Sequence, residues 1–274
     1  MIGQDRIRIG NQTAWSAGSL MAPFEYAVYM GFDAFEWFPD INEFGVGWRE
    51  SDVSSNMRDM IRDTALRHDM RLSVHAPWDA NPIFNQGAER LFVSLEFAKD
   101  IGASILVTHL FCEQGLSTYI HHILPIIREL SQANIMLAIE NTPFNPPDDF
   151  NILFGYLKTF SPLLSKHVGM CFDLGHANLT SMTQNNYIKF IDSLDTDLLI
   201  NHVHLHENYG DMDSHLPLFT GPSAIDSSGI EGLLRLLIKR GFSGSMILEQ
   251  WPSSREYLLE TARNRLVELI KKAG

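Results

Sequence analysis

Residues 201–216 read NHVHLHENYGDMDSHL and contain four of the 11 histidines of the chain. His202, His204 and His206 alternate with apolar residues, which is the period of a β-strand, so the three imidazoles are expected on one side. Imidazole is the commonest metal ligand among protein side chains. We therefore interpret this segment as a strand that ends at the edge of a metal site.

A turn follows this strand and leads to Asp213 and His215. A carboxylate and an imidazole two residues apart can both reach one cation. The loop that contains them, residues 207–228, is the longest irregular segment that we expect in the chain. The remaining ligands of such a site should come from the other strands, one strand at a time.

Strand-like and helix-like segments alternate along the whole chain. We expect strands at residues 7–13, 34–38, 71–76, 104–110, 135–141, 168–174, 199–206 and 244–250. We expect helices at residues 23–31, 54–69, 85–102, 118–133, 148–160, 185–194, 229–240 and 254–272, with the fourth kinked by Pro125 and the fifth capped by Asp148. Eight such units with short connections predict a single (β/α)8 TIM barrel domain over residues 1–274, with a doubly wound open sheet as the alternative.

Polar residues at the ends of six consecutive strands favour the barrel. The strand-end residues are His75, His109, Glu140, Asp173, His204 and Glu249, and the connections on the same side add His176, Asp213 and His215. In a barrel the carboxyl ends of the strands converge on one mouth, whereas in an open sheet they are spread along an edge. Unpaired charges there would be costly to bury, and metal coordination accounts for all nine side chains together.

The composition describes an acidic globular chain. Of 274 residues, 45% are hydrophobic and 20% charged, and 33 Asp and Glu outnumber 21 Lys and Arg, which gives a net charge of −12. An acidic surface repels nucleic acid and anionic membranes, so we expect a small-molecule partner instead. Two cysteines are too few for a disulfide framework, and no signal peptide or membrane-spanning run is evident, which predicts a cytoplasmic location.

Several other residues have competing structural and functional interpretations. Trp15, Trp37 and Trp78 follow or end early strands and are candidates for the wall of a substrate pocket, although a core role fits their positions equally well. His206 and Glu207 are candidates for the mouth of the site. We expect the remaining residues to be structural or solvated, namely His202 and Cys171 in the barrel interior and His68, His121, His122 and His167 on helices or connections.

Six segments resemble the xylose isomerase-like superfamily, namely VHAPW, ILVTHL, AIENT, CFDLGHAN, HVHLHENYGDMDSHLPL and MILEQW. This superfamily contains sugar and sugar-phosphate isomerases and epimerases, inosose dehydratases and the endonuclease IV-like enzymes of AP endonuclease family 2. The resemblance covers nearly the whole chain and implies a TIM barrel with a divalent-metal site at its mouth.

Two site patterns of this superfamily match the sequence. The epimerase-like pattern implies one metal held by Glu140, Asp173, His204 and Glu249. The endonuclease IV-like pattern implies three zinc ions, with the first held by His75, His109 and Glu140, the second by Glu140, Asp173, His204 and Glu249, and the third by His176, Asp213 and His215. Imidazole-rich ligation favours Zn²⁺, and a carboxylate-rich site with one imidazole also suits Mn²⁺ or Mg²⁺.

The favoured hypothesis is a metal-dependent isomerase or epimerase of a sugar, sugar phosphate or polyol, in which Glu140 and Glu249 transfer protons and His176 contacts the substrate. An endonuclease IV-like zinc phosphoesterase is the alternative, and a non-catalytic metal-binding barrel is the third hypothesis. The net charge opposes a nuclease. The chain also departs from both patterns, because LFTGP follows the loop histidine, Leu110 follows His109, and no arginine follows shortly after His204. Association into a homo-oligomer is compatible with the fold.

Overall fold

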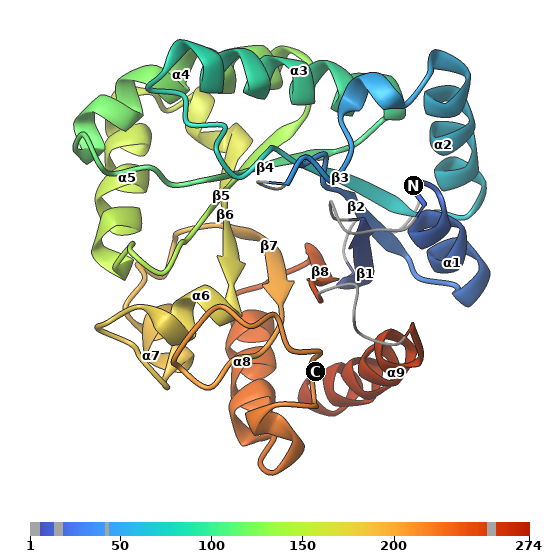
Figure 1. Ribbon diagram of the computed structural model, residues 1–274. Coiled ribbons are helices and arrows are strands. Elements are labelled where there is room, and N and C mark those ends of the chain that lie inside the picture. The colour runs from blue at the N-terminus through green and yellow to red at the C-terminus, as the bar shows by residue number, and fades with distance from the viewer. Residues whose placement is uncertain (1–5, 14–18, 42–43, 251–255) are drawn as a thin grey trace.

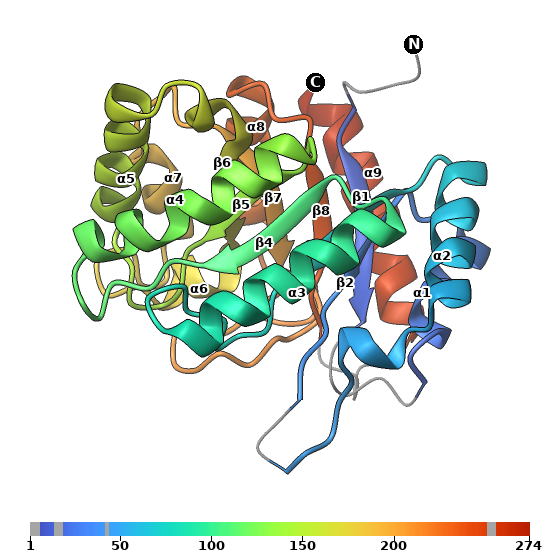
Figure 2. The same ribbon diagram turned by 90° about the horizontal axis from the view of Figure 1, so that it is seen from above.

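The structure is a computed structural model that describes residues 6–13, 19–41, 44–250 and 256–274. Eight parallel strands follow one another in chain order around a closed barrel, and β8 pairs with β1 (Figure 1). Helices pack around the outside of the strands, as the view from above shows (Figure 2). The closure between β1 and β8 confirms the expected (β/α)8 barrel and excludes the open sheet.

The strands match the eight segments expected from the sequence. They are β1 (Arg8–Thr13), β2 (Ala34–Trp37), β3 (Arg71–His75), β4 (Ile105–His109), β5 (Met136–Glu140), β6 (Val168–Asp173), β7 (Ile200–Leu205) and β8 (Ser245–Leu248). Most of their residues are buried, because one face of each strand points into the barrel and the other packs under the helices. Strands in this setting need nearly continuous apolar runs, which is why the sequence pattern located them.

The helices that cover the barrel also correspond to the expected ones, with one addition. They are α1 (Ala22–Met30), α2 (Ser55–Arg67), α3 (Asn85–Ile101), α4 (Leu116–Gln132), α5 (Pro147–Phe160), α7 (Tyr187–Asp192), α8 (Ser228–Lys239) and α9 (Glu256–Ala273), together with the unexpected α6 (Leu174–Leu179). Short 3₁₀ turns lie at Glu50–Asp52, Leu164–His167 and Pro222–Ala224. Within the described ranges, no helix is long and apolar enough to cross a membrane.

One expectation about a helix end needs correction. Asp148 does not cap α5, because the helix already begins at Pro147 with Pro146 as its N-cap residue. A proline suits the first helical position, because an N–H at that position would have no partner within the helix. Asp148 lies in the first turn, where its negative charge interacts favourably with the positive end of the helix dipole. Pro125 lies inside α4 on its exposed side, and the helix continues past it to Gln132, so the kink expected there stays a prediction.

The strand register brings the ionisable residues together in neighbouring pairs. His109 of β4 lies beside Glu140 of β5, and Asp173 of β6 lies beside His204 of β7. Below this level the barrel interior is filled by small apolar side chains, among them Val107, Ala138 and Cys171. Cys171 is therefore a core residue, as expected.

Candidate metal centre

Six strands bring one ionisable side chain each to the same mouth of the barrel. Four of these residues are the last of their strands, one is the last but one of β7, and one directly follows β8; they are His75, His109, Glu140, Asp173, His204 and Glu249. All six except His109 are at least 95% buried. The short helix α6 adds His176, because the carboxylate of Asp173 caps the helix by accepting the backbone N–H of His176 at 2.6 Å.

Glu140 lies at the centre of this cluster. Its Oε2 lies 2.8 Å from Nε2 of His75 and 3.7 Å from Nε2 of His109. Its Oε1 lies 3.2 Å from Nδ1 of His176 and 3.4 Å from Nδ1 of His204. A single carboxylate that is surrounded by four imidazoles has the position of a ligand that could be shared between neighbouring cation sites.

The tautomers imposed on the histidines fit a bound cation. Nδ1 of His75 lies 2.6 Å from the carbonyl oxygen of Ala76, and a carbonyl can only accept, so this nitrogen carries a proton. Neutral His75 would then turn the lone pair of Nε2 toward the carboxylate of Glu140. Either a second proton or a cation relieves that repulsion. Three more histidines place Nδ1 near a backbone carbonyl in the same way, namely His109, His176 and His215.

The distances around His204 also suit one ion. Nδ1 of His204 lies 3.1 Å from Oε2 of Glu249, 3.4 Å from Oε1 of Glu140 and 3.8 Å from Oδ2 of Asp173. Ligand atoms about 2.1 Å from a tetrahedral zinc ion lie about 3.4 Å from one another. Nδ1 of His204 and Oε2 of Glu249 are buried without a hydrogen-bond partner of favourable geometry in the described structure. These four residues therefore fit a divalent metal.

A second group of ligand-type atoms lies where the long loop meets α6. Oδ2 of Asp213 lies 3.1 Å from Nε2 of His215 and 3.3 Å from Nε2 of His176. His215 adopts a left-handed backbone with φ of 43°, an unusual conformation for a residue with a side chain. His206 stacks on His215 with ring centroids 3.9 Å apart, and its Nε2 lies 3.1 Å from Oδ2 of Asp173.

The buried carboxylates and imidazoles of the cluster shift one another's pKa values in opposite directions. Burial alone would raise the pKa of Glu140, but His204 and His109 outweigh it and hold this pKa well below its usual range. Burial alone would lower the pKa of His204, but the neighbouring side chain of Cys171 and the carboxylates of Glu249, Glu140 and Glu36 outweigh it and raise this pKa well above its usual value; at neutral pH the carboxylates are the charged groups among these neighbours. The same balance raises the pKa of His176. Lowered carboxylate pKa values beside the raised pKa values of His204 and His176 describe a site that favours positive charge.

Comparison with known proteins identifies the family. A family model described as xylose isomerase-like TIM barrel matches residues 24–271. The chain belongs to this family. Over 177 residues it is 29% identical to the uncharacterized protein MJ1311 of Methanocaldococcus jannaschii, and this match spans 57% of each chain.

Solved structures with the same barrel fold align over almost the full length of the chain. A D-tagatose 3-epimerase-like protein aligns with a TM-score of 0.72 at 21% identity, over 97% of this chain and 98% of that one. The TTHB071 protein from Thermus thermophilus, in a crystal soaked with ZnCl2, aligns with a TM-score of 0.66 at 20% identity over the same shares. An L-ribulose 3-epimerase aligns with a TM-score of 0.71 at 14% identity, over 97% of this chain and 95% of that one. Likeness at these identities shows the fold.

A pocket of about 660 Å³ opens beside the cluster in this xylose isomerase-like barrel. His109 and His176 form the wall that it shares with the cluster, and Trp78, Phe111 and Phe144 line it elsewhere. The described lining residues include no lysine or arginine. Trp78 is therefore well placed to contact a substrate.

Two other residues assigned to the substrate pocket, Trp37 and His206, do not line it. Trp37 is fully buried among Phe24, Phe35 and other aromatic residues outside the barrel, so we place it in the core. Trp15 lies outside the described residues. His206 is fully buried between the carboxylate of Asp173 and the ring of His215.

Glu207 holds the long loop together and does not face the pocket. Its carboxylate accepts backbone N–H groups from Thr220, Gly221 and Ser223 at 2.9–3.2 Å. Its backbone pairs in both directions with Leu216. Glu207 thus fixes the course of the segment that carries Asp213 and His215, a structural role that the sequence alone did not indicate.

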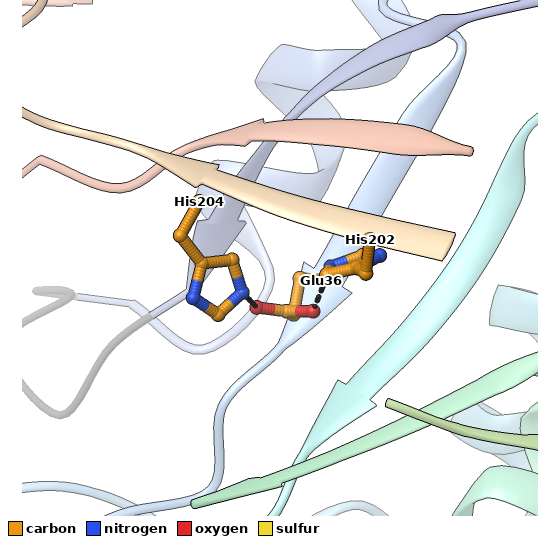
Figure 3. Close-up of side chains that lie close together, drawn as sticks. All are labelled: Glu36, His202 and His204. Carbon is orange, nitrogen blue, oxygen red and sulfur yellow. Dashed lines mark hydrogen bonds and ion pairs between the residues drawn. The ribbon is translucent and has the colours of Figure 1, made fainter. Parts of the chain in front are cut away.

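The sequence reasoning missed Glu36, a fully buried glutamate in the middle of β2. Its carboxylate lies between His202 and His204 (Figure 3). Nε2 of His202 lies 2.8 Å from Oε2, and Nε2 of His204 lies 2.8 Å from Oε1. A charge within an apolar strand is costly unless it is paired, and this cost was the available signal. His202 fills the barrel interior as expected, as the partner of Glu36.

Proposed function

We propose that this chain is a divalent-metal-dependent isomerase or epimerase that acts on a small polyhydroxylated carbonyl compound, most simply an unphosphorylated ketose. The proposal takes Glu140, Asp173, His204 and Glu249 as the metal ligands. Zinc suits the imidazole-rich surroundings, and manganese or magnesium would suit the three carboxylates.

The observation that carries the proposal is the convergence of two buried carboxylates on one imidazole. Glu140 and Glu249 come from strands on different sides of the barrel, and both lie within 3.4 Å of Nδ1 of His204. The positive charge of His204 also contributes to lowering the pKa of Glu249, although burial opposes it, so both carboxylates are ionised at neutral pH. Two carboxylates beside one substrate position can act as general base and general acid, and so remove a proton from carbon and return one to it.

The residues of the chain support a two-sided proton transfer. A divalent ion, when bound, would act as a Lewis acid toward the carbonyl of the substrate. One glutamate accepts the proton from the carbon next to that carbonyl. The other glutamate takes up a proton from solvent, gives it to the opposite face of that carbon and so inverts the centre, and the first glutamate then releases its proton to solvent. His176 borders both the cluster and the pocket, and it can donate a hydrogen bond to a substrate hydroxyl.

The pocket supports a neutral substrate. Its described lining offers histidines, backbone groups and aromatic faces, and no basic side chain to neutralise a phosphate. Aromatic faces suit the apolar side of a sugar. Structures with this fold include proteins described as D-psicose 3-epimerase and L-ribulose 3-epimerase, whose names give neutral ketoses as their substrates.

The proposal is tested with deuterium exchange. The protein, loaded with Zn²⁺ or Mn²⁺, is incubated in D2O with a panel of ketopentoses and ketohexoses, and NMR follows both the products and the deuterium at carbon. We expect a product with deuterium at the inverted carbon, and none from Glu140→Gln or Glu249→Gln. Conversion without deuterium incorporation would indicate hydride transfer and contradict the roles of the glutamates.

A second candidate function, a zinc phosphoesterase, is favoured by one observation. His75, His109, His176, Asp213 and His215 surround the four proposed ligands, and a single-metal epimerase does not require them all. Hydrolysis of bis(p-nitrophenyl) phosphate by the zinc-loaded protein, with no reaction on the sugar panel, would support this function and replace the first.

A further inference from the structure

Glu36 is a buried carboxylate that the proposed reaction does not use. It is fully buried in β2 and points into the barrel interior beneath the mouth. Its Oε2 accepts a hydrogen bond from Oγ of Ser73 at 2.8 Å and lies 2.8 Å from Nε2 of His202. Its Oε1 lies 2.8 Å from Nε2 of His204. Three elements, β2, β3 and β7, thus meet at one carboxylate.

His204 differs from the other histidines of the centre in how it is oriented. His75, His109, His176 and His215 each place Nδ1 near a backbone carbonyl. His204 instead has its Nε2 against Glu36 and its Nδ1 toward the other carboxylates. Within the described structure neither ring nitrogen of His204 makes a hydrogen bond of favourable geometry, and the ion-pair contacts of both nitrogens are with carboxylates.

We infer that Glu36 is a positioning residue that fixes the tautomer of His204, so that Nδ1 is the nitrogen presented to the metal. This inference rests on the metal centre of the proposed function. Nε2 of His204 lies 2.8 Å from Oε1 of Glu36 in an ion-pair contact that does not have hydrogen-bond geometry. Because a carboxylate oxygen only accepts, this contact favours the tautomer of His204 that carries its proton on Nε2. The lone pair is then left on Nδ1, the atom that lies 3.1 Å from Glu249 and 3.4 Å from Glu140. Carboxylates placed behind metal-ligating histidines act in this way and increase their basicity.

The surroundings keep Glu36 itself from turning. Ser73 and His202 hold one oxygen, which leaves the other for His204. The ring of His204 is further limited by the ring of His75, which stacks on it at 5.5 Å with an interplanar angle of 25°. An apolar residue would fill the same space without the cost of burying a charge. The geometry therefore favours a role toward the metal over simple filling of the barrel.

The substitution Glu36→Gln makes the inference testable. The oxygen of the introduced amide would accept from Ser73 and His202, and its NH2 group would then donate to Nε2 of His204. That contact reverses the tautomer and places the proton on Nδ1, facing the metal. We expect zinc affinity to fall by about 10- to 100-fold, as for other supporting partners of metal-ligating histidines. Glu50→Gln is the matched control, because Glu50 is a buried glutamate that also accepts from a serine, Ser94, outside the barrel.

Two readouts separate positioning from a purely structural role. Zinc affinity of each variant is measured by competition with a chelating dye, with circular dichroism to verify folding. The wild-type protein is labelled with ¹⁵N and loaded with ¹¹³Cd, and scalar coupling shows which nitrogen of His204 binds the ion. Nδ1 coordination, weakened zinc binding in Glu36→Gln and normal binding in Glu50→Gln are the expected results.

The outcomes that overturn the inference are distinct from failure of the proposed function. Cadmium bound through Nε2 of His204, or zinc affinity of Glu36→Gln equal to wild type, overturns the role of Glu36 alone. A wild-type protein that binds neither cadmium nor zinc overturns the metal centre, and the role of Glu36 with it. If Glu36→Gln does not fold, the cadmium measurement on the wild-type protein still decides.

Discussion

Removal of the charge of Glu140 is the most informative perturbation of the centre. Glu140→Gln keeps the shape of the side chain and removes a full negative charge from a fully enclosed site. Its oxygens lie 2.8 Å from His75, 3.2 Å from His176 and 3.4 Å from His204, so a cation bound among these nitrogens lies close to the lost charge.

The size of the effect follows from these distances. At an effective dielectric constant of about 20, one unit charge about 4 Å from an opposite charge contributes about 4 kcal/mol. Since about 1.4 kcal/mol corresponds to a tenfold change in Kd, zinc affinity should fall by about a thousandfold. A divalent ion would feel more than this, and the cost of burying the carboxylate offsets part of the gain.

The assay is competition for zinc against a chelating dye, with Glu96→Gln as the control. Glu96 is an exposed glutamate on α3 whose carboxylate pairs with Lys99, away from the mouth. The control should bind zinc as the wild type does. If folded Glu140→Gln binds zinc with unchanged affinity, Glu140 is not a ligand and the reasoning fails.

Three further predictions concern packing, protonation and the pocket. A Cβ at Gly175 in α6 would lie 1.9 Å from Cε1 of His206, so Gly175→Ala should lower the free energy of unfolding by about 1–3 kcal/mol. Gly155→Ala in α5, where a Cβ meets nothing within 4 Å, should instead raise it by about 0.5–1 kcal/mol in the same denaturant titration. The pKa values of His176 and His204 are raised in the folded protein, so the folded state binds protons more tightly than the unfolded state does. Metal-free protein therefore has this stabilisation in full below about pH 6.5 and loses it as the pH rises through the pKa values of the folded state. Thermal unfolding with EDTA should therefore show a falling Tm above neutrality, and zinc affinity should rise over the same range; a flat profile for both would contradict the protonation of the cluster. Finally, Phe144→Ala should raise KM for the active ketose with kcat nearly unchanged, while Phe160→Ala on the outer surface of α5 should change neither.

The fold was predictable because the barrel imposes a simple pattern on the chain. Each strand is buried on both faces, so a segment such as ILVTH of β4 is apolar until its last residues. The final residue is polar because it reaches the mouth. The same logic located Glu140 and Asp173 from the sequence. The short helix α6 escaped prediction because six residues show no helical period, and only the cap made by Asp173 marks its start.

The parts that escaped prediction depend on contacts between distant segments. Glu36 and His202 are 166 positions apart, and nothing local in either strand indicates that they pair. Trp37 follows Glu36, and strand alternation turns it outward into the aromatic core, one of the two roles that its place at a strand end allowed. Glu207 was a candidate for the mouth of the site, but its carboxylate accepts backbone N–H groups of Thr220 and Ser223, further along the same loop.

The central claim is that the cluster at the barrel mouth holds a divalent metal ion. Elemental analysis of the purified protein, with no metal added, measures this directly when it is repeated on His204→Ala. We predict at least one zinc or manganese ion per wild-type chain, and loss of that ion in the variant. A wild-type protein that retains no divalent metal, even after incubation with Zn²⁺, Mn²⁺ or Mg²⁺, would contradict the account.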